Sequence, residues 1–390
     1  MRLRHLLSAV LLFGFTVAIV VGCAQEPTIE VVDSPSPTPE ARDPNAPLVI
    51  GYSNWVGWWP WAIAEAEGLF AAEGVNVELK WFDSYLGSME ALATGEIDGN
   101  CQTLSDTISF AGDAVNGEVV VLVNDNSAGN DKIIVSDEIN AIADLSGKKV
   151  AVEEGIVGDF LLTLALEKQG MSRDDVDIVP LETATAVEAF VSGQTDAVGA
   201  FAPFWLTALK RDGAKELISS AEFPGAIPDL LVMSATAIES HAEDIQGLIN
   251  VWFSILKWMR ENPDQANQIM ADRANVTLEE LELLKRGTRF FSLPDNLEAF
   301  APGDNMQHMQ FAAQMMAKFM VNVDFIPKAP DLETLLDERF IQAYAERVGE
   351  ADTSVEDVAA FRAASGLDEP DTEVKQEPAL SDMKGSSDVN

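Results

Sequence analysis

The chain is poor in the side chains on which metal and nucleophilic chemistry most often depends. Its 390 residues include two cysteines and three histidines, too few for a disulfide framework and little for a zinc site. Basic residues are also scarce, since 25 Lys and Arg stand against 64 Asp and Glu, for a net charge of −39. Because phosphate recognition needs a basic surface, we expect no nucleic-acid partner. We also expect no cofactor and no metal site.

Long uncharged runs are missing except at the extreme N-terminus. Residues 1–22 have a basic start and a 17-residue apolar run, Leu6–Gly22, which is short for a membrane-spanning helix and typical of a secretory signal. The following Val20-Val21-Gly22-Cys23 resembles a bacterial lipobox, with Val where that motif prefers Leu and a small residue. We therefore expect a lipoprotein signal peptide at 1–22 and a lipid on Cys23 that anchors a periplasmic protein to a membrane. An uncleaved N-terminal anchor is the alternative.

Two segments have the composition of chain outside a folded core. Residues 23–47 contain six prolines, and proline at that density gives an extended tether. Residues 350–390 are acidic and are expected to form a disordered tail. The leader contributes +2 to the net charge, the tether −4 and the tail −8, which leaves −29 for residues 48–349. A body so acidic is typical of solubility or adaptation to salt, and its field would also concentrate a cationic solute.

Between these segments, short β-rich runs alternate with helical ones. Strands are expected at Leu48–Ser53, Val75–Phe82, Ile97–Cys101, Lys149–Glu153, Val176–Leu181 and Ala197–Phe201, and helices include Pro60–Glu73, Phe160–Gln169 and Ala242–Glu261. Strands that alternate with helices of about 10–15 residues call for parallel sheets built from βαβ units. We therefore predict an α/β fold with two lobes and a helical C-terminal part. The first lobe is expected at 48–131 and 236–349, and the second, with its hinge strands, at 132–235.

Several runs can be matched to a known family in order and spacing. They are Leu48–Ser53, Ala64–Glu78, Phe82–Asp98, Leu145–Val152, Ala189–Val198 and Ala202–Phe204. Together they resemble the taurine/sulfonate/nitrate group of ABC-importer solute-binding proteins. The resemblance implies a two-lobe periplasmic-binding-protein fold (type II), a two-segment hinge, a ligand in the cleft, and an ABC permease and ATPase as membrane partners. Within that group, Gly51–Trp58 is most similar to importers encoded near urea- and guanidine-degrading enzymes.

The residues expected to line the cleft are aromatic and acidic. In open parallel sheets, ligands sit beyond the carboxyl ends of the strands, where this sequence has no Lys or Arg. Indole faces attract cations, by about 0.5–2 kcal/mol each when desolvated, whereas carboxylates repel anions. The resemblance aligns Asp229 with an aspartate expected to meet the ammonium of taurine-type ligands. The expected ligand-binding residues are Trp55, Trp58, Asp83, Ser84, Thr103, Glu154, Phe201 and Asp229.

Some of these positions have a second interpretation. Glu153 and Glu154 cannot both face the cleft, because neighbours at a strand end point in opposite directions, and we favour Glu154. Asp83 could instead cap the helix that follows it. Trp61 is excluded because it is expected to face inward on its helix, and Trp59 is left open.

The expected function is capture of a small nitrogen-containing cation, best matched by guanidinium, by the non-enzymatic solute-binding component of an ABC importer. Guanidinium is planar and suits both bidentate carboxylates and stacking aromatic rings. Binding of taurine or an alkanesulfonate, nitrate or bicarbonate is the alternative within the same fold. A remote alternative is an enzyme resembling the thiamine-pyrimidine synthase family, whose active-site His no cleft position supplies. The lobes are expected to close about a hinge near Asp131–Ser136 and Asp229–Ala235.

Overall fold

The computed structural model describes residues 46–349. The expected signal peptide, the lipobox with Cys23, nearly all of the tether and the acidic tail therefore lie outside the described residues. All of the described residues belong to a single compact unit. None of the helices within 46–349 combines the length and the apolar character needed to cross a membrane.

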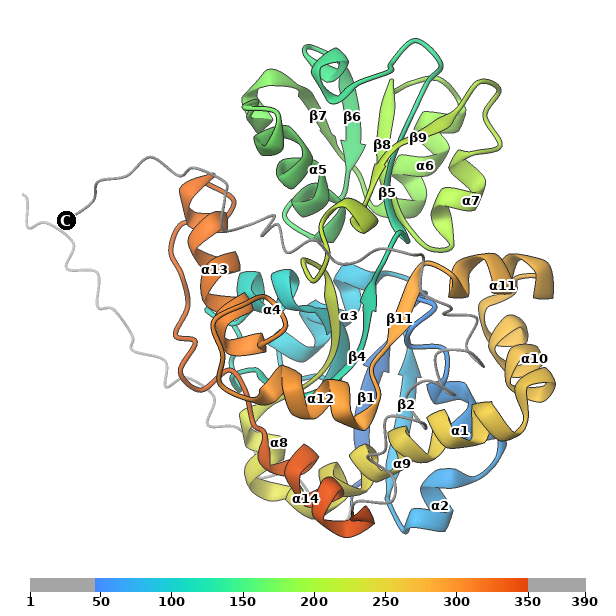
Figure 1. Cartoon of the computed structure of the whole chain (residues 1–390), viewed down its shortest axis with the longest axis vertical. Coiled ribbons are helices and arrows are strands. Elements are labelled where there is room, and N and C mark those ends of the chain that lie inside the picture. Colours follow the sequence, from blue (N-terminus) through green and yellow to red (C-terminus); the bar gives the residue numbers. More distant parts are fainter. Residues whose placement is uncertain (1–45, 350–390) are drawn as a thin grey trace, which may run out of the picture. The chain divides into compact units, whose positions relative to one another are not determined.

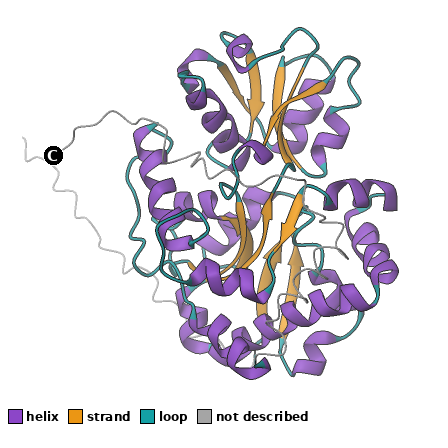
Figure 2. Cartoon of the chain, viewed as in Figure 1, coloured by secondary structure: helices purple, strands orange, loops and turns teal. Residues whose placement is uncertain are grey.

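Two β-sheets flanked by helices make up the described part of the chain (Figures 1 and 2). The first sheet has the strand order β11-β4-β10-β3-β1-β2, and the second has the order β7-β6-β8-β5-β9. The strands of the first sheet are β1 (Leu48–Tyr52), β2 (Val77–Trp81), β3 (Gly99–Thr103), β4 (Val119–Ser127), β10 (Pro228–Met233) and β11 (Thr288–Phe290). Those of the second are β5 (Asp131–Val135), β6 (Lys149–Val152), β7 (Asp177–Pro180), β8 (Ala197–Phe201) and β9 (Lys215–Ser219). The predicted α/β fold with two lobes is confirmed.

Helices accompany each sheet and define the two lobes. The helices of the first lobe are α1 (Trp61–Ala66), α2 (Leu69–Glu73), α3 (Tyr85–Ala93), α4 (Leu104–Phe110), α8 (Ala235–Ser240), α9 (Ala242–Glu261), α10 (Pro263–Ala274), α11 (Leu278–Lys285), α12 (Leu293–Phe300), α13 (Met309–Asn322) and α14 (Arg339–Val348). Those of the second lobe are α5 (Val157–Lys168), α6 (Thr183–Val191) and α7 (Phe204–Ala208). Because helices cover the sheets, β3, β8 and β10 are buried along their whole length.

Each sheet mixes parallel and antiparallel strands, whereas the sequence predicts parallel pairing. β1 pairs parallel with β2 and β3, and β6 pairs parallel with β7 and β8. β10 runs antiparallel between β3 and β4, and β5 runs antiparallel between β8 and β9. Both of these strands begin where the chain has just crossed from the other sheet, through residues 128–130 before β5 and residues 220–227 before β10.

This topology moves the crossings away from the predicted hinge. Asp131–Ser136 and Asp229–Ala235 fall mostly inside β5 and β10, where ladder hydrogen bonds hold the backbone, rather than in the connecting segments. The range 132–235 expected for the second lobe also includes β10, which pairs with β3 and β4 in the first sheet. A crossing strand cannot be assigned to one sheet from sequence, because its hydrophobic pattern suits either neighbour.

Local sequence explains where several helices begin and end. The side chains of Ser84 and Thr103 accept hydrogen bonds from the first turns of α3 and α4. The predicted helix Pro60–Glu73 is instead divided into α1 and α2, because Gly68 adopts a left-handed backbone with a φ of 66°.

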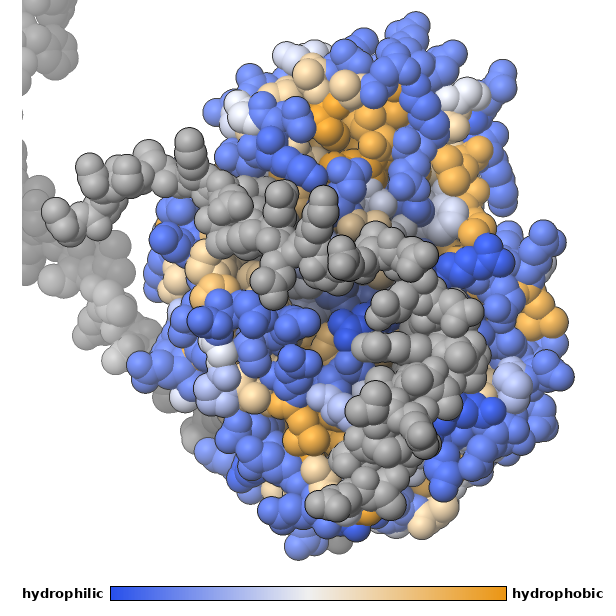
Figure 3. Space-filling view, viewed as in Figure 1, coloured by the Kyte–Doolittle hydropathy of each residue, from blue (hydrophilic) through white to orange (hydrophobic). Residues whose placement is uncertain are grey.

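Large aromatic side chains fill the core, and hydrophilic residues dominate the coloured part of the face shown in Figure 3. Trp59, Trp61 and Trp252 are among the largest fully buried side chains. The rings of Trp61 and Trp252 lie 5.0 Å apart, which places Trp61 in the core of the first lobe as predicted. Trp59, left open above, is also fully buried.

β4 is absent from the strands expected above, and a side chain completes its hydrogen bonding. Asn296 Oδ1 accepts from the Val123 amide at 2.9 Å, and its Nδ2 donates to the Val123 carbonyl at 3.0 Å. β11 is only three residues long and pairs with Asp125–Ser127, so it does not reach Val123. The Asn296 amide thus replaces a neighbouring strand at this point.

Replacing Asn296 by alanine should destabilise the protein by about 2–4 kcal/mol, because each buried backbone group left unpaired costs about 1–3 kcal/mol. Urea unfolding of Asn296→Ala would measure the loss. Asn322→Ala, at an exposed position at the end of α13, is the matched control and should change the free energy of unfolding little. Equal stabilities of the two variants would contradict this role for Asn296.

Candidate functional site

A small pocket lies where the two lobes meet. It encloses about 230 Å³ of space free of atoms, part of it open to solvent. None of the described residues that line it is a lysine or an arginine. The lining residues are Trp55, Trp58, Tyr85, Thr103, Asp131, Val157, Phe201 and Asp229.

Strand pairing explains why acidic residues reach this pocket from both lobes. Asp229, near the start of β10, is paired with Thr103, the last residue of β3. Asp131, the first residue of β5, is paired in the same way with Phe201, the last residue of β8. Because β10 and β5 run antiparallel to β3 and β8, each begins at the carboxyl edge of its sheet, where ligands of α/β folds bind. The two lobes therefore present equivalent aspartates.

Aromatic rings form a continuous wall beside these acids. The ring centroids of Trp55 and Trp58 lie 6.3 Å apart, and Trp58 lies 5.5 Å from Tyr85. Tyr85 in turn meets Phe201 of the other lobe edge to face, at 5.9 Å and 77°. Gly57 permits this arrangement, since a Cβ built on it would lie 1.8 Å from Oδ2 of Asp125. The loop after β1 can thus press its tryptophans against the acids only with glycine at that position.

Three hydrogen bonds hold the wall in place. Trp55 Nε1 donates to Asp125 Oδ1 at 3.1 Å. The Tyr85 hydroxyl donates to Asp106 Oδ2 at 2.7 Å and accepts from the Thr103 amide at 2.9 Å. Asp106 and Asp125 are both fully buried, so they stand behind the lining residues as anchors. The aromatic wall is therefore fixed by two further buried acidic side chains.

Burial and mutual repulsion favour the protonated forms of these carboxyls. Burial raises the pKa of Asp106 and of Asp131 to about 7, and that of Asp125 to about 8. Burial, followed by the charge of Asp125, raises the pKa of Asp229 well above its ordinary value. The charge of Asp131 also raises the pKa of both Asp125 and Asp229. The empty site therefore holds protons near neutral pH.

Several polar atoms at this site have no partner within the described part of the chain. They are Oδ2 of Asp125, Asp131 and Asp229 and the indole nitrogen of Trp58, all of them buried. Buried polar groups are normally hydrogen-bonded, so these four atoms together indicate a place for a polar ligand or water. Within 46–349, no group of three or more His, Cys, Asp or Glu side chains is arranged to hold a metal ion.

Five of the eight predicted ligand-binding residues line the pocket, namely Trp55, Trp58, Thr103, Phe201 and Asp229. The other three do not. Asp83 is exposed and accepts a hydrogen bond from Trp81 Nε1 at 2.9 Å, and Ser84 caps α3 through the Gly87 amide at 3.1 Å.

Neither Glu153 nor Glu154 lines the pocket, so the preference for Glu154 stays a prediction. The Glu154 side chain is 56% exposed and pairs with Arg173 at 3.2 Å. Glu153 turns inward, and its Oε2 accepts from the hydroxyl of Thr183 at 2.8 Å and from its amide at 3.2 Å, at the start of α6. β6 ends at Val152, so both glutamates follow the strand and its alternation does not fix their directions.

Tyr85, Asp131 and Val157 line the pocket but are absent from the predicted set. Asp131 could have been predicted by symmetry, because it lies at the start of the crossing strand β5 as Asp229 lies near the start of β10. Tyr85 occupies the first turn of α3, directly after the predicted residues Asp83 and Ser84. The acidic Asn124-Asp-Asn126 run that ends β4 was a further signal for Asp125.

Residues 41–274 match the model of the NMT1-like family. The chain belongs to the NMT1-like family. A Brucella abortus protein described as a binding protein is 30% identical over 246 residues, which cover 60% of this chain and 75% of that protein. A Bacillus subtilis protein described as aliphatic sulfonates-binding is 25% identical over 302 residues, which cover 77% of this chain and 85% of that protein.

Solved structures share the fold. The alkanesulfonate-binding protein of Xanthomonas axonopodis pv. citri, bound to MOPS, superposes with a TM-score of 0.61 at 20% identity and covers 76% of this chain and 100% of its own. The desulfurization enzyme DSZB superposes with a TM-score of 0.54 at 16% identity and covers 77% and 100%. The chain thus has the periplasmic-binding-protein fold, which by itself does not decide between binding and catalysis.

Replacing Asp229 by asparagine should stabilise the ligand-free protein at high pH. An unfolded Asp has a pKa of about 3.9, so a raised native pKa means that the native state binds more protons above that value. This contribution to stability is complete below about pH 4 and is lost as pH rises through the native pKa. Asp229→Asn should therefore melt at nearly the wild-type temperature at about pH 4 and at least about 2 °C higher at about pH 9.

Thermal unfolding followed by circular dichroism at both pH values would measure this difference. Asp113→Asn, at an exposed position, removes the same formal charge and should show no such dependence on pH. A melting temperature for Asp229→Asn below that of the wild type at both pH values would show that Asp229 does not carry unfavourable charge.

Proposed function

We propose that this protein is the extracytoplasmic solute-binding component of an ABC importer. Membership of the NMT1-like family and similarity to proteins described as binding proteins support this role. A pocket at the meeting of two lobes, built at the carboxyl edges of both sheets, is the geometry that such a role requires. The proposal includes a periplasmic location, a lipid anchor through Cys23, and a membrane permease with its ATPase as partners.

We propose further that the ligand is a small nitrogen-containing cation, with guanidinium as the best candidate. The observation that carries this proposal is a pocket lined by Asp131 and Asp229, walled by aromatic rings, with no basic lining residue among those described. A planar cation with N–H groups along its edges would donate to the unpaired carboxylate oxygens. Its faces would stack on Trp55 and Trp58.

Binding of a sulfonate, nitrate or bicarbonate is the alternative. Relatives described as sulfonate-binding favour it, and helix N-termini can hold anions without basic side chains. In this pocket an anion would have to lie beside Asp131 and Asp229, so both carboxyls would need to be protonated. The raised pKa values of Asp131 and Asp229 would allow this near neutral pH, so the aromatic wall, more than charge alone, favours the cation.

Catalysis is a weaker proposal for this site. His241 and His308 are the histidines within the described residues, and neither lines the pocket. His241 lies beside Asp244 at the start of α9, and His308 precedes α13. The carboxyls of the site face aromatic rings rather than a nucleophile, which suits recognition better than reaction.

Isothermal titration calorimetry at near-neutral pH should show guanidinium binding more tightly than taurine, nitrate or bicarbonate. Urea is the matched neutral control, because it has a similar planar shape but lacks the charge. It should bind more weakly than guanidinium, since it would leave the buried carboxylates uncompensated. Binding of taurine or nitrate at micromolar concentrations, with no guanidinium binding at all, would overturn the cation and leave the solute-binding role intact.

The pH dependence of affinity provides an independent test of ligand charge. A cation needs ionised carboxylates, whereas the empty pocket holds protons because the pKa of Asp131 is about 7 and that of Asp125 about 8. Affinity for guanidinium should therefore rise between about pH 6 and pH 9, with protons released on binding. Affinity for an anion would change in the opposite direction, so calorimetry in buffers of different ionisation enthalpy separates the two.

The loss of affinity caused by each substitution should depend on whether the residue lines the pocket. Asp229→Asn should weaken guanidinium binding by about two or more orders of magnitude, because breaking a buried ion pair costs about 3–5 kcal/mol. Trp58→Ala should cost less, about 0.5–2 kcal/mol, as expected for a cation on an indole face. Glu96→Gln is the control, because Glu96 belongs to an exposed ion pair with Lys80 and such pairs contribute about 0–1 kcal/mol. A larger loss of affinity from Glu96→Gln than from Asp229→Asn would contradict this site.

A further inference from the structure

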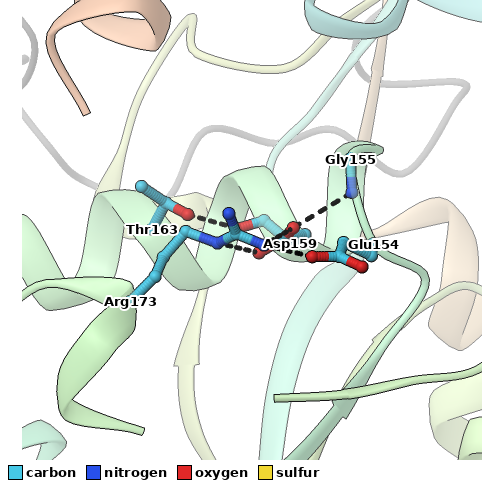
Figure 4. Close-up of polar contacts among 5 residues, drawn as sticks. All are labelled: Glu154, Gly155, Asp159, Thr163 and Arg173. Carbon is cyan, nitrogen blue, oxygen red and sulfur yellow. Dashed lines mark hydrogen bonds and ion pairs between the residues drawn. The ribbon is translucent and has the colours of Figure 1, made fainter. Parts of the chain in front are cut away.

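A second contact between the lobes lies outside the pocket, around Arg173. Arg173 follows α5 in the second lobe, and its guanidinium makes a two-point contact with Asp159 on that helix (Figure 4). Nε donates to Asp159 Oδ1 at 3.0 Å, and Nη2 donates to Oδ2 at 2.7 Å. Asp159 is fully buried, so Arg173 supplies the charge that compensates it.

The same group of contacts holds the loop that leads from β6 to the pocket. Asp159 Oδ2 also accepts from the Gly155 amide at 3.0 Å, and Arg173 Nη2 reaches Glu154 Oε1 at 3.2 Å (Figure 4). Gly155 has a φ of 82°, a conformation that suits glycine and turns the chain sharply. Two residues later the chain reaches Val157, which lines the pocket. Arg173 is thus connected to the pocket wall through Asp159 and Gly155.

The face of the same guanidinium packs on the first lobe. Arg173 Cζ lies 5.6 Å from the ring centroid of Phe325, which follows α13. Phe160, the residue after Asp159 on α5, meets Phe319 and Phe325 edge to face at 6.0 and 6.1 Å. Phe160 is fully buried and Phe319 nearly so, so this is a packed contact between lobes.

We propose that Arg173 is a positioning residue and that, with Phe160, Phe319 and Phe325, it forms a latch that holds the lobes together and fixes the β6–α5 loop for ligand binding. None of these four residues lines the pocket, so the latch contacts no ligand. Its effect is on the fraction of molecules whose lobes are closed. Because apparent affinity scales with the fraction in the binding-competent state, the latch strengthens binding of every ligand by one common factor.

Two variants disrupt the latch from opposite sides. Phe325→Leu removes the first-lobe ring that contacts Arg173 and leaves the Arg173–Asp159 pair intact. Arg173→Gln alone would leave Asp159 buried without its partner and could fail to fold, so the double variant Asp159→Asn with Arg173→Gln removes the charge as well. Each altered protein is compared with the full-length wild type by small-angle scattering without ligand and by calorimetry.

Matched controls are available within single lobes. Arg211 packs on the Phe190 ring at 4.5 Å and donates to the carbonyls of Phe190 and Thr195, all within the second lobe. Phe70 stacks on Trp61 at 6.3 Å within the first lobe. Arg211→Gln and Phe70→Leu remove comparable groups without touching a contact between lobes. Thermal unfolding of all variants reports the purely structural cost.

The latch variants should have a larger radius of gyration than the wild type without ligand, and the control variants should not. The latch variants should also weaken guanidinium and methylguanidinium by the same factor, about 5- to 30-fold. An unchanged radius of gyration and unchanged affinities in both latch variants would overturn the proposal, and so would a loss that differs between the two ligands.

The affinity measurement relies on the proposed cation function, whereas the scattering measurement does not. If neither cation binds the wild type, the proposed ligand is wrong and the radii of gyration without ligand still decide the latch. If the cations bind but the latch variants behave like the controls, the latch is wrong and the proposed function stands.

Discussion

The rest of this structure depends on one constraint, which is that acidic side chains are buried without basic side chains to match them. Four aspartates, at positions 106, 125, 131 and 229, are buried around one pocket whose described lining has no basic side chain. Isolated carboxylates are costly to bury, so the site must either hold protons or receive a cation. The raised pKa of all four carboxyls shows the first solution in the ligand-free chain. The second solution is the proposed function, in which a ligand replaces the protons.

The fold produces this concentration of charge through its two crossings. A chain that passes from one sheet to the other must enter the new sheet at the edge nearest the first, which is the edge where ligands bind. Asp131 and Asp229 are the residues placed there, and each is paired with the last residue of a parallel strand. The same topology occurs at both crossings, and it therefore places one aspartate from each lobe at the pocket. It also explains why a site between lobes can be assembled from residues more than ninety positions apart.

Sequence alone could predict the architecture because the relevant signals are local and repetitive. The bounds of α9 and β8 agree with the prediction, since a long amphipathic pattern and a short apolar run before polar residues are unambiguous. The aromatic half of the pocket was also accessible, because Trp55 and Trp58 follow the first strand directly. These inferences needed only the rule that ligands bind beyond strand ends.

The remaining features depend on choices that sequence periodicity leaves open. Glu153 and Glu154 both follow the end of β6, so strand alternation does not decide their directions, and contacts with Thr183 and Arg173 hold them instead. Asp131 is found only if the chain is known to change sheets just before it. The role of Asn296 beside β4 is equally non-local, because its partner, Val123, lies 173 residues away in sequence. Long-range pairing, rather than weak local propensity, is what the prediction lacked.

The proposed latch and the pocket contribute to binding in physically different ways. In the proposed function, charge and ring contacts at Asp229 and Trp58 would discriminate between ligands, because they act only on what occupies the pocket. The Arg173 cluster has no such contact, so it can set how often the pocket is assembled without altering its preference. The pocket itself also crosses the lobes, through the edge-to-face contact of Tyr85 with Phe201. In this proposal, both the pocket and the latch stabilise the closed lobes, and the ligand contributes only at the pocket. Changes near α13 would then alter affinity, whereas the aspartates would determine specificity.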